Sequence, residues 1–135
     1  MLIFLDIDGV LRRTSSPPYQ LDYDLVANFK KFVTRIEGDE MVEIIITSTW
    51  KEVFSLDAIR AKLGFPLALK VCGTTKPLAR PGGFERHREI CQYLAQEAKT
   101  LSWIAIDDQA DHFPPGLENL LLCDPTRGFL GGQYA

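Results

Sequence analysis

The sequence predicts an α/β fold in which helices cover both faces of a mainly parallel sheet. Short apolar runs of the kind that form buried strands alternate with longer segments whose apolar residues recur at helical spacing. Glycines and prolines separate the two kinds of segment. Because parallel strands need a crossover connection, this alternation is typical of a parallel sheet.

Length and composition place the chain among ordinary globular proteins. Its 135 residues form one expected domain, 1–135, which is large enough for a hydrophobic core. Hydrophobic residues make up 46% and charged residues 24% of the chain. The net charge of −3 indicates no basic surface overall, so any contact with nucleic acid is expected to be local.

The cysteines and the start of the chain bear on localisation. Cys72, Cys91 and Cys123 lie far apart without a CxxC pair, which favours reduced thiols over a disulfide framework or a zinc site. Met1 runs directly into the first predicted strand and Asp6 interrupts its apolar run, so we expect no signal peptide. No apolar stretch has the length of a membrane span. We therefore expect a cytoplasmic protein without a membrane contact.

The first predicted strand is the apolar run 1–5, which ends in two aspartates and a glycine. Because side chains alternate along a strand, Asp6 and Asp8 are expected to project to the same side at its carboxyl end. Two carboxylates this close repel unless one is protonated or a cation such as Mg²⁺ lies between them. Gly9 allows the backbone to turn away. Taken alone, the motif is also compatible with a turn carrying two solvated aspartates.

The remaining elements follow from periodicity and turn signals. Segment 12–19 is polar and rich in proline, and is expected to be a surface loop. Asp22 or Asp24 is expected to cap a helix that reaches Ile36 and stops before Gly38. The expected elements after it are strand 41–46, a short helix over 56–63 closed by Gly64, a weaker strand 67–71, a loop over 73–83, a helix over 84–99, strand 101–106 and strand 120–123. Residues His87, Ile90, Cys91, Leu94 and Ala98 are expected on one face of the later helix.

Polar residues follow several of these strands at the end where parallel sheets bind ligands. They are Asp6, Asp8, Thr47, Ser48, Asp107 and Asp108. Several carboxylates with a hydroxyl and a cation suit phosphoryl transfer. One carboxylate attacks as nucleophile, another moves the proton, and Mg²⁺ and one Lys or Arg balance the phosphate charge.

The ordered motifs resemble those of a known superfamily. The segments 6–11, 46–50 and 106–108 resemble motifs I, II and IV of the haloacid dehalogenase (HAD) superfamily of phosphohydrolases. The chain further resembles the HAD domain of Swiss-Army-knife RNA-repair proteins, which is related to polynucleotide-kinase phosphatase domains. The Ser/Thr-Trp pair after the second strand, the Arg-x-x-Glu-Ile run 86–90 and the turn 124–128 carry this part of the resemblance. It implies a three-layer Rossmann-like (HAD-like) fold.

The resemblance also implies a role for each motif residue. Asp6 is expected to be the nucleophile and a direct Mg²⁺ ligand. Asp8 is expected to be the general acid/base and to meet the metal only through its backbone carbonyl. Thr47 is expected to bind the phosphoryl group, and Ser48 to contribute a backbone amide. Asp108 is expected to be the acidic metal ligand of motif IV, with Asp107 beside it or sharing the role.

The resemblance also implies one Lys or Arg as motif III, in the segment before motif IV, and the sequence leaves open which residue it is. Lys76, Arg86 and Arg88 precede motif IV, and the Arg-x-x-Glu-Ile spacing favours Arg86. The alternative for each is a solvated surface cation, which is the commoner fate of such a side chain. Arg12 and Arg13 lie where the superfamily forms a flap, and either contact substrate phosphates or remain solvated.

Three further side chains have a structural reading beside a functional one. Trp50 follows a buried strand, so core packing is favoured over stacking on a base or sugar. His87 is expected to be a packed side chain, and His112 either reaches the site or stays outside it.

The segments between the motifs leave no room for a large cap domain. In this superfamily an open, capless site accompanies bulky substrates, by analogy. We therefore expect a Mg²⁺-dependent phosphatase that forms an aspartyl-phosphate intermediate and acts on a terminal phosphate of RNA or DNA. The alternatives are a small-molecule phosphatase and a catalytically silent binding module.

Overall fold

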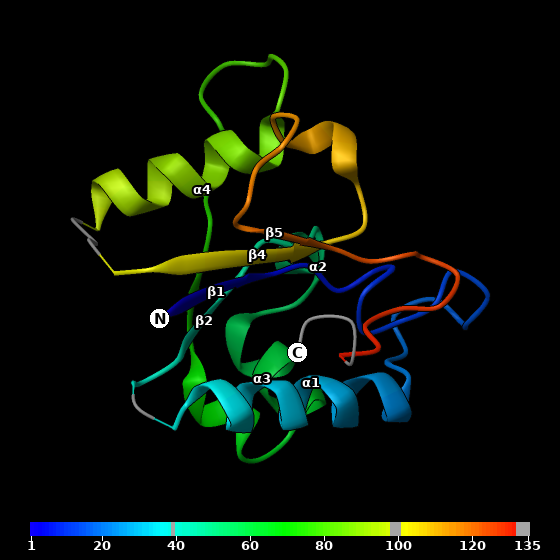
Figure 1. The fold of residues 1–135 in the computed structure, drawn as a ribbon. Helices are drawn as coiled ribbons and strands as arrows, with labels where there is room; N and C mark the ends of the chain where they lie inside the picture. The colour runs from blue at the N-terminus through cyan, green and yellow to red at the C-terminus, as the bar shows by residue number, and fades with distance from the viewer. Residues whose placement is uncertain (39, 98–100, 132–135) are drawn as a thin grey trace.

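A computed structural model describes residues 1–38, 40–97 and 101–131. Its centre is a sheet of parallel strands in the order β3-β2-β1-β4-β5 (Figure 1). The strands are β1 (Leu2–Leu5), β2 (Glu43–Ile46), β3 (Val71–Thr74), β4 (Trp103–Asp107) and β5 (Leu120–Leu122). The opening apolar run therefore forms the middle strand, with β2 on one side and β4 on the other.

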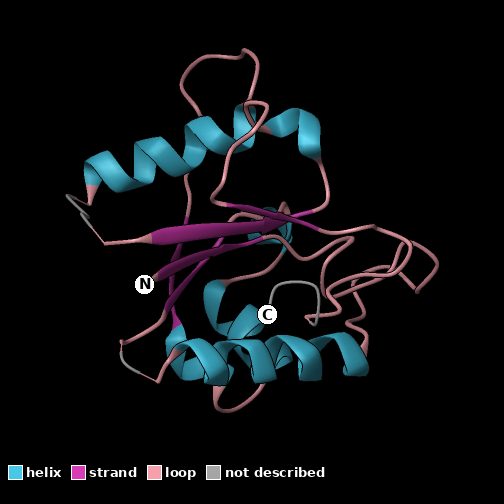
Figure 2. Cartoon of the chain, viewed as in Figure 1, coloured by secondary structure: helices cyan, strands magenta, loops and turns pink. Residues whose placement is uncertain are grey.

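Helices cover both faces of the sheet and complete a three-layer Rossmann-like fold (Figure 2). They are α1 (Tyr23–Ile36), α2 (Trp50–Val53), α3 (Leu56–Leu63) and α4 (Glu85–Gln96), with 3₁₀ turns η1 (Leu67–Lys70) and η2 (Ala110–His112). Helices α1 and α3 lie below the sheet in Figure 1, and α4 and η2 lie above it. Within the described residues, the segments between the motifs form no cap domain, as expected.

Alternation along the middle strands divides the core between the two faces. Ile3 and Leu5 pack with α1 and α3, whereas Leu2 and Phe4 pack toward α4. All four side chains are fully buried, and each stabilises the fold by about 1.5–3 kcal/mol relative to an exposed position. Burial on both faces explains why this strand is an unbroken apolar run in the sequence.

Helix α1 confirms the predicted helix and its apolar stripe. Phe29 and Phe32 are buried and meet Phe129 from the end of the chain in edge-to-face contacts, with ring centroids 5.8 and 5.3 Å apart. Asp22 occupies the N-cap position, but its carboxylate accepts hydrogen bonds from the Arg13 backbone N–H and the Ser16 hydroxyl. Asp22 therefore fixes the position of the loop that precedes the helix.

Two predicted elements are wrong in detail. Residues 67–70 form the 3₁₀ turn η1 instead of a strand, and β3 begins only at Val71 and extends into the predicted loop. A short apolar run does not distinguish a strand from a helical turn. Helix α4 is shorter than predicted and exposes Cys91, while Ile90 is buried; Ala98 and Lys99 lie outside the described residues.

None of the described helices has the length and apolar character needed to cross a membrane.

Candidate active site

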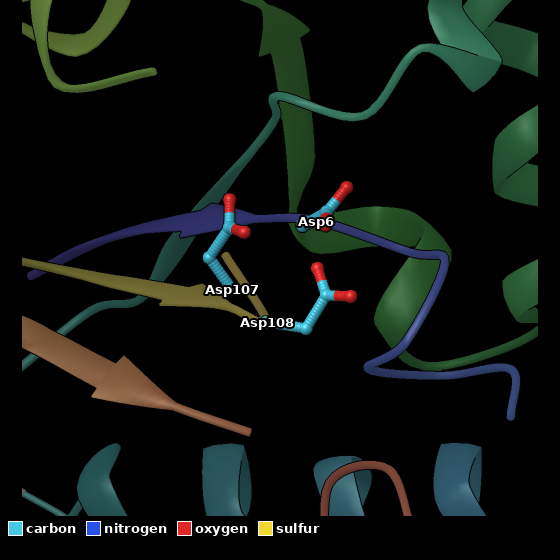
Figure 3. A group of neighbouring side chains, drawn as sticks. All are labelled: Asp6, Asp107 and Asp108. Carbon is cyan, nitrogen blue, oxygen red and sulfur yellow. The ribbon is translucent and has the colours of Figure 1, made fainter. Parts of the chain in front are cut away.

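Three aspartates meet where β1 and β4 end. The two strands are in register, Leu5 beside Ile106, and the Asp6 backbone N–H donates to the Ile106 carbonyl at 3.0 Å. This pairing brings Asp6 next to Asp107 and Asp108. One carboxylate oxygen from each of the three lies within 4.8 Å of the others (Figure 3). We call these three residues the acidic cluster.

Burial and mutual repulsion dominate the electrostatics of the acidic cluster. Burial raises the pKa of Asp6 well above its ordinary value, and the Asp107 charge raises it further, while Arg86 opposes both effects. Burial likewise raises the pKa of Asp107 to about 6. The site thus holds carboxylates that are costly to ionise without a compensating cation.

The acidic cluster fits a magnesium ion on its own chemistry. Among the described residues, the buried oxygens Asp107 Oδ2 and Asp108 Oδ1 have no hydrogen-bond partner. Unpartnered carboxylate oxygens on converging side chains are the donors that Mg²⁺ prefers. Gly9 leaves room for the Asp108 side chain. A Cβ at residue 9, where φ is +80°, would lie 2.2 Å from Asp108 Oδ2.

Asp8 is held outside the acidic cluster. Because β1 ends at Leu5, strand alternation does not direct this side chain. Its Oδ1 accepts hydrogen bonds from Trp50 Nε1 at 3.1 Å and from Arg12 Nη1 at 3.3 Å. The carboxylate is 47% exposed. Its expected metal contact through the backbone carbonyl stays a prediction, as does its role as general acid/base.

Thr47 and Ser48 follow β2 and are both buried beside the end of β1. The Thr47 backbone N–H donates to the Leu5 carbonyl at 3.0 Å, which continues the pairing of β2 with β1 past the strand end. The Ser48 hydroxyl accepts from the Trp50 backbone N–H at 3.1 Å. The Ser48 hydroxyl thus shapes this turn. The predicted phosphoryl contacts of both residues are not tested by these bonds.

Of the three candidate cations, Arg86 is the one that the described contacts link to the acidic cluster. Its Nε lies 3.6 Å from Asp107 Oδ2, and its Nη1 donates to the Thr47 carbonyl. Arg88 donates instead to the Arg80 carbonyl at 3.2 Å, and Lys76 is exposed in the loop after β3. The structure therefore favours Arg86 as the motif III cation.

Sequence reasoning missed a partly buried network that holds Arg86. Glu89 accepts from Arg86 Nη1 at 3.1 Å through one oxygen and from Lys51 Nζ at 2.7 Å through the other. Lys51 also donates to the Thr75 hydroxyl at 2.9 Å, and its side chain is only 10% exposed. Two signals were available: Glu89 lies one helical turn after Arg86, and Lys51 closely follows the end of β2.

A cavity of about 490 Å³ opens beside these residues. Lys51, Arg86 and Glu89 form part of its wall, and His112 lines it as well. None of Asp6, Asp107 and Asp108 lines this cavity, so a contact of His112 with the acidic cluster stays a prediction. His87, in contrast, packs against Trp103, and burial lowers its pKa.

The two arginines after motif I are both engaged within the protein. Arg12 donates from Nε to the Pro17 carbonyl at 2.9 Å and from Nη2 to the Ser16 carbonyl at 2.7 Å, in addition to its contact with Asp8. Arg13 forms a two-pronged ion pair with Asp24. Both side chains fold the loop onto the domain, so the expected phosphate contact of Arg12 stays a prediction.

Comparison with known proteins identifies the family of the chain. The profile of the family described as the HAD domain in Swiss Army Knife RNA repair proteins matches residues 2–131. The searches of curated proteins and of solved structures found no match. The matched range includes every strand, the acidic cluster and Arg86. The chain therefore belongs to the family of HAD domains found in Swiss Army Knife RNA repair proteins.

Proposed function

We propose that this protein is a Mg²⁺-dependent phosphomonoester hydrolase that forms an aspartyl-phosphate on Asp6, and that its substrates are terminal phosphates of RNA or DNA. The observation that carries the proposal is the proximity of the Asp6 carboxylate to two further carboxylates, with Arg86 beside Asp107. Family membership supports the same chemistry and is the basis for the nucleic-acid substrate.

Each residue has a distinct part in the proposed reaction. The Asp6 carboxylate attacks the phosphorus atom, the bond to the leaving oxygen breaks, and Asp8 gives that oxygen a proton. Asp8 then takes a proton from a water molecule, whose oxygen displaces Asp6 and releases inorganic phosphate. Arg86 lies where it can balance negative charge on the phosphoryl oxygens, and Glu89 and the Thr47 carbonyl hold its guanidinium in place.

Asp6, Asp107 and Asp108 are the residues that would hold the metal ion. When bound, Mg²⁺ supplies positive charge that lowers the repulsion between the phosphate and the attacking carboxylate. It also compensates the burial of carboxylates whose ionisation the protein alone disfavours. These two electrostatic effects, on the substrate and on the buried carboxylates, are the physical reason for proposing a metal at the acidic cluster.

The test measures phosphate release with and without Mg²⁺ from p-nitrophenyl phosphate and from oligonucleotides carrying a terminal phosphate. We expect turnover that needs Mg²⁺ and that Asp6→Asn abolishes, since the amide is not a nucleophile. Asp111→Asn removes the same charge at an exposed site on η2 and is expected to leave turnover unchanged. Turnover of p-nitrophenyl phosphate without turnover of oligonucleotides would indicate a small-molecule phosphatase. Equal background rates for wild type and Asp6→Asn would indicate a silent binding module.

A further inference from the structure

We propose that Trp50 is a positioning residue that sets the orientation of the Asp8 carboxylate for proton transfer. This inference rests on the proposed function, because it assigns Trp50 to the step in which Asp8 protonates the leaving oxygen. It gives the Trp after the second strand a task besides core packing.

The geometry distinguishes the two oxygens of Asp8. Oδ1 receives both donors, the indole Nε1–H of Trp50 at 3.1 Å and Nη1 of Arg12 at 3.3 Å. No hydrogen bond from the described residues reaches Oδ2. Two donors on one oxygen restrict rotation of the carboxylate about its terminal torsion, which is otherwise broad. The other oxygen is left available to the substrate.

Trp50 is well placed to act as a rigid support. Its side chain is 1% exposed, and its backbone N–H donates to the Ser48 hydroxyl in the turn after β2. Phe54 packs on the indole with ring centroids 5.4 Å apart. A buried indole N–H needs an acceptor, and here that acceptor is a carboxylate that is partly open to solvent.

The loop after motif I closes over the same indole. Tyr19 meets the Trp50 ring edge-on at 5.7 Å, and its backbone has a φ of +59°, which is uncommon for a residue with a side chain. Such conformations persist where surrounding contacts require them, often near functional sites. Arg12, from the start of this loop, supplies the second donor to Asp8. The loop and the turn after β2 therefore hold one carboxylate between them.

The test compares two substrates whose leaving groups differ in their need for a proton. p-Nitrophenolate leaves without one, whereas the alkoxide of β-glycerol phosphate must be protonated as the P–O bond breaks. The quantity to compare is kcat/KM, which covers steps up to the aspartyl-phosphate and excludes the hydrolysis that both substrates share. We expect Trp50→Phe, which lacks the indole N–H, to lower kcat/KM for β-glycerol phosphate by about tenfold or more and for p-nitrophenyl phosphate by less than about threefold.

The matched control is Phe54→Leu, which disturbs the packing around the indole but leaves its N–H in place. It is expected to change kcat/KM for the two substrates by similar factors. If Trp50→Phe also lowers both by the same factor, the role of Trp50 is structural and the proposal is overturned. If wild type hydrolyses neither substrate, the proposed function itself fails, and the assignment of Trp50 to proton transfer fails with it.

A spectroscopic measurement tests the contact without any need for turnover. The chain has two tryptophans, so the indole N–H resonances of Trp50 and Trp103 are assigned in ¹H–¹⁵N spectra by comparison with Trp103→Phe. Asp8→Ala leaves Trp50 intact and removes its acceptor. We expect the Trp50 indole proton to move upfield in Asp8→Ala while that of Trp103 stays in place. An unchanged Trp50 resonance would overturn the proposal.

Discussion

Replacing Asp107 by Asn should stabilise the metal-free protein at neutral pH more than at acid pH. Asp107 is 2% exposed, and its pKa rises from the ordinary 3.8 to about 6 because burial disfavours its charge. The folded state therefore binds this proton more tightly than the unfolded state does. At a pH below both pKa values, the Asp107 carboxyl is neutral in the folded and the unfolded state, so it does not lower the stability. As the pH rises through this interval, the wild-type protein loses stability.

The size of the effect follows from the two pKa values. A shift from 3.8 to about 6 corresponds to roughly 3 kcal/mol of stability lost once the group is ionised in both states. About 1 kcal/mol of this loss is already present at pH 4.5, so about 2 kcal/mol develops between pH 4.5 and pH 7.5. Asn carries no charge at either pH. The advantage of Asp107→Asn over wild type should grow by that amount.

The assay is urea unfolding of both proteins with EDTA present, at pH 4.5 and pH 7.5, with free energies from linear extrapolation. Asp111→Asn is the matched control, since it removes the charge of a nearby carboxylate that is exposed and therefore carries no burial cost. The reasoning about buried carboxylates is refuted if the difference between Asp107→Asn and wild type does not change with pH.

Two further substitutions test the metal site and a local feature of the fold. Gly9→Ala should weaken Mg²⁺ binding in calorimetry by about tenfold or more, because the new Cβ would displace Asp108. Gly64→Ala, also at positive φ but with open space around it, should leave the affinity unchanged, and equal losses in both variants would contradict the explanation. Ser55→Ala should lower the free energy of unfolding by about 1 kcal/mol, because the hydroxyl caps α3 by accepting from the Ala58 N–H at 3.1 Å. An unchanged urea midpoint would show that this cap does not contribute.

Hydrophobic periodicity predicts the elements correctly where many of their side chains are buried. The run 1–5 and the stripe of α1 were recognised because strands buried on both faces and helices buried on one face leave different periods in the sequence. Val71–Thr74 was misplaced because β3 pairs on one edge with β2 alone and buries few side chains. The end of α4 was likewise set by packing that a helical period does not reveal.

The meeting of Asp6 with Asp107 and Asp108 follows from the sequence alone. Acids that directly follow neighbouring parallel strands lie close together at the carboxyl-end edge of the sheet. The fold was needed to show that, among the described contacts, Arg86 is the candidate cation that reaches this edge, while Arg88 binds the Arg80 carbonyl and Lys76 is exposed.

The fold also brings the Trp50 indole N–H into hydrogen-bond contact with Asp8, which lies 42 positions away in the sequence. The Arg86 contact depends on the rotation of α4 about its axis, and the Trp50 contact depends on the path of the loop after β1. Both are set by packing between distant segments, which no local pattern encodes.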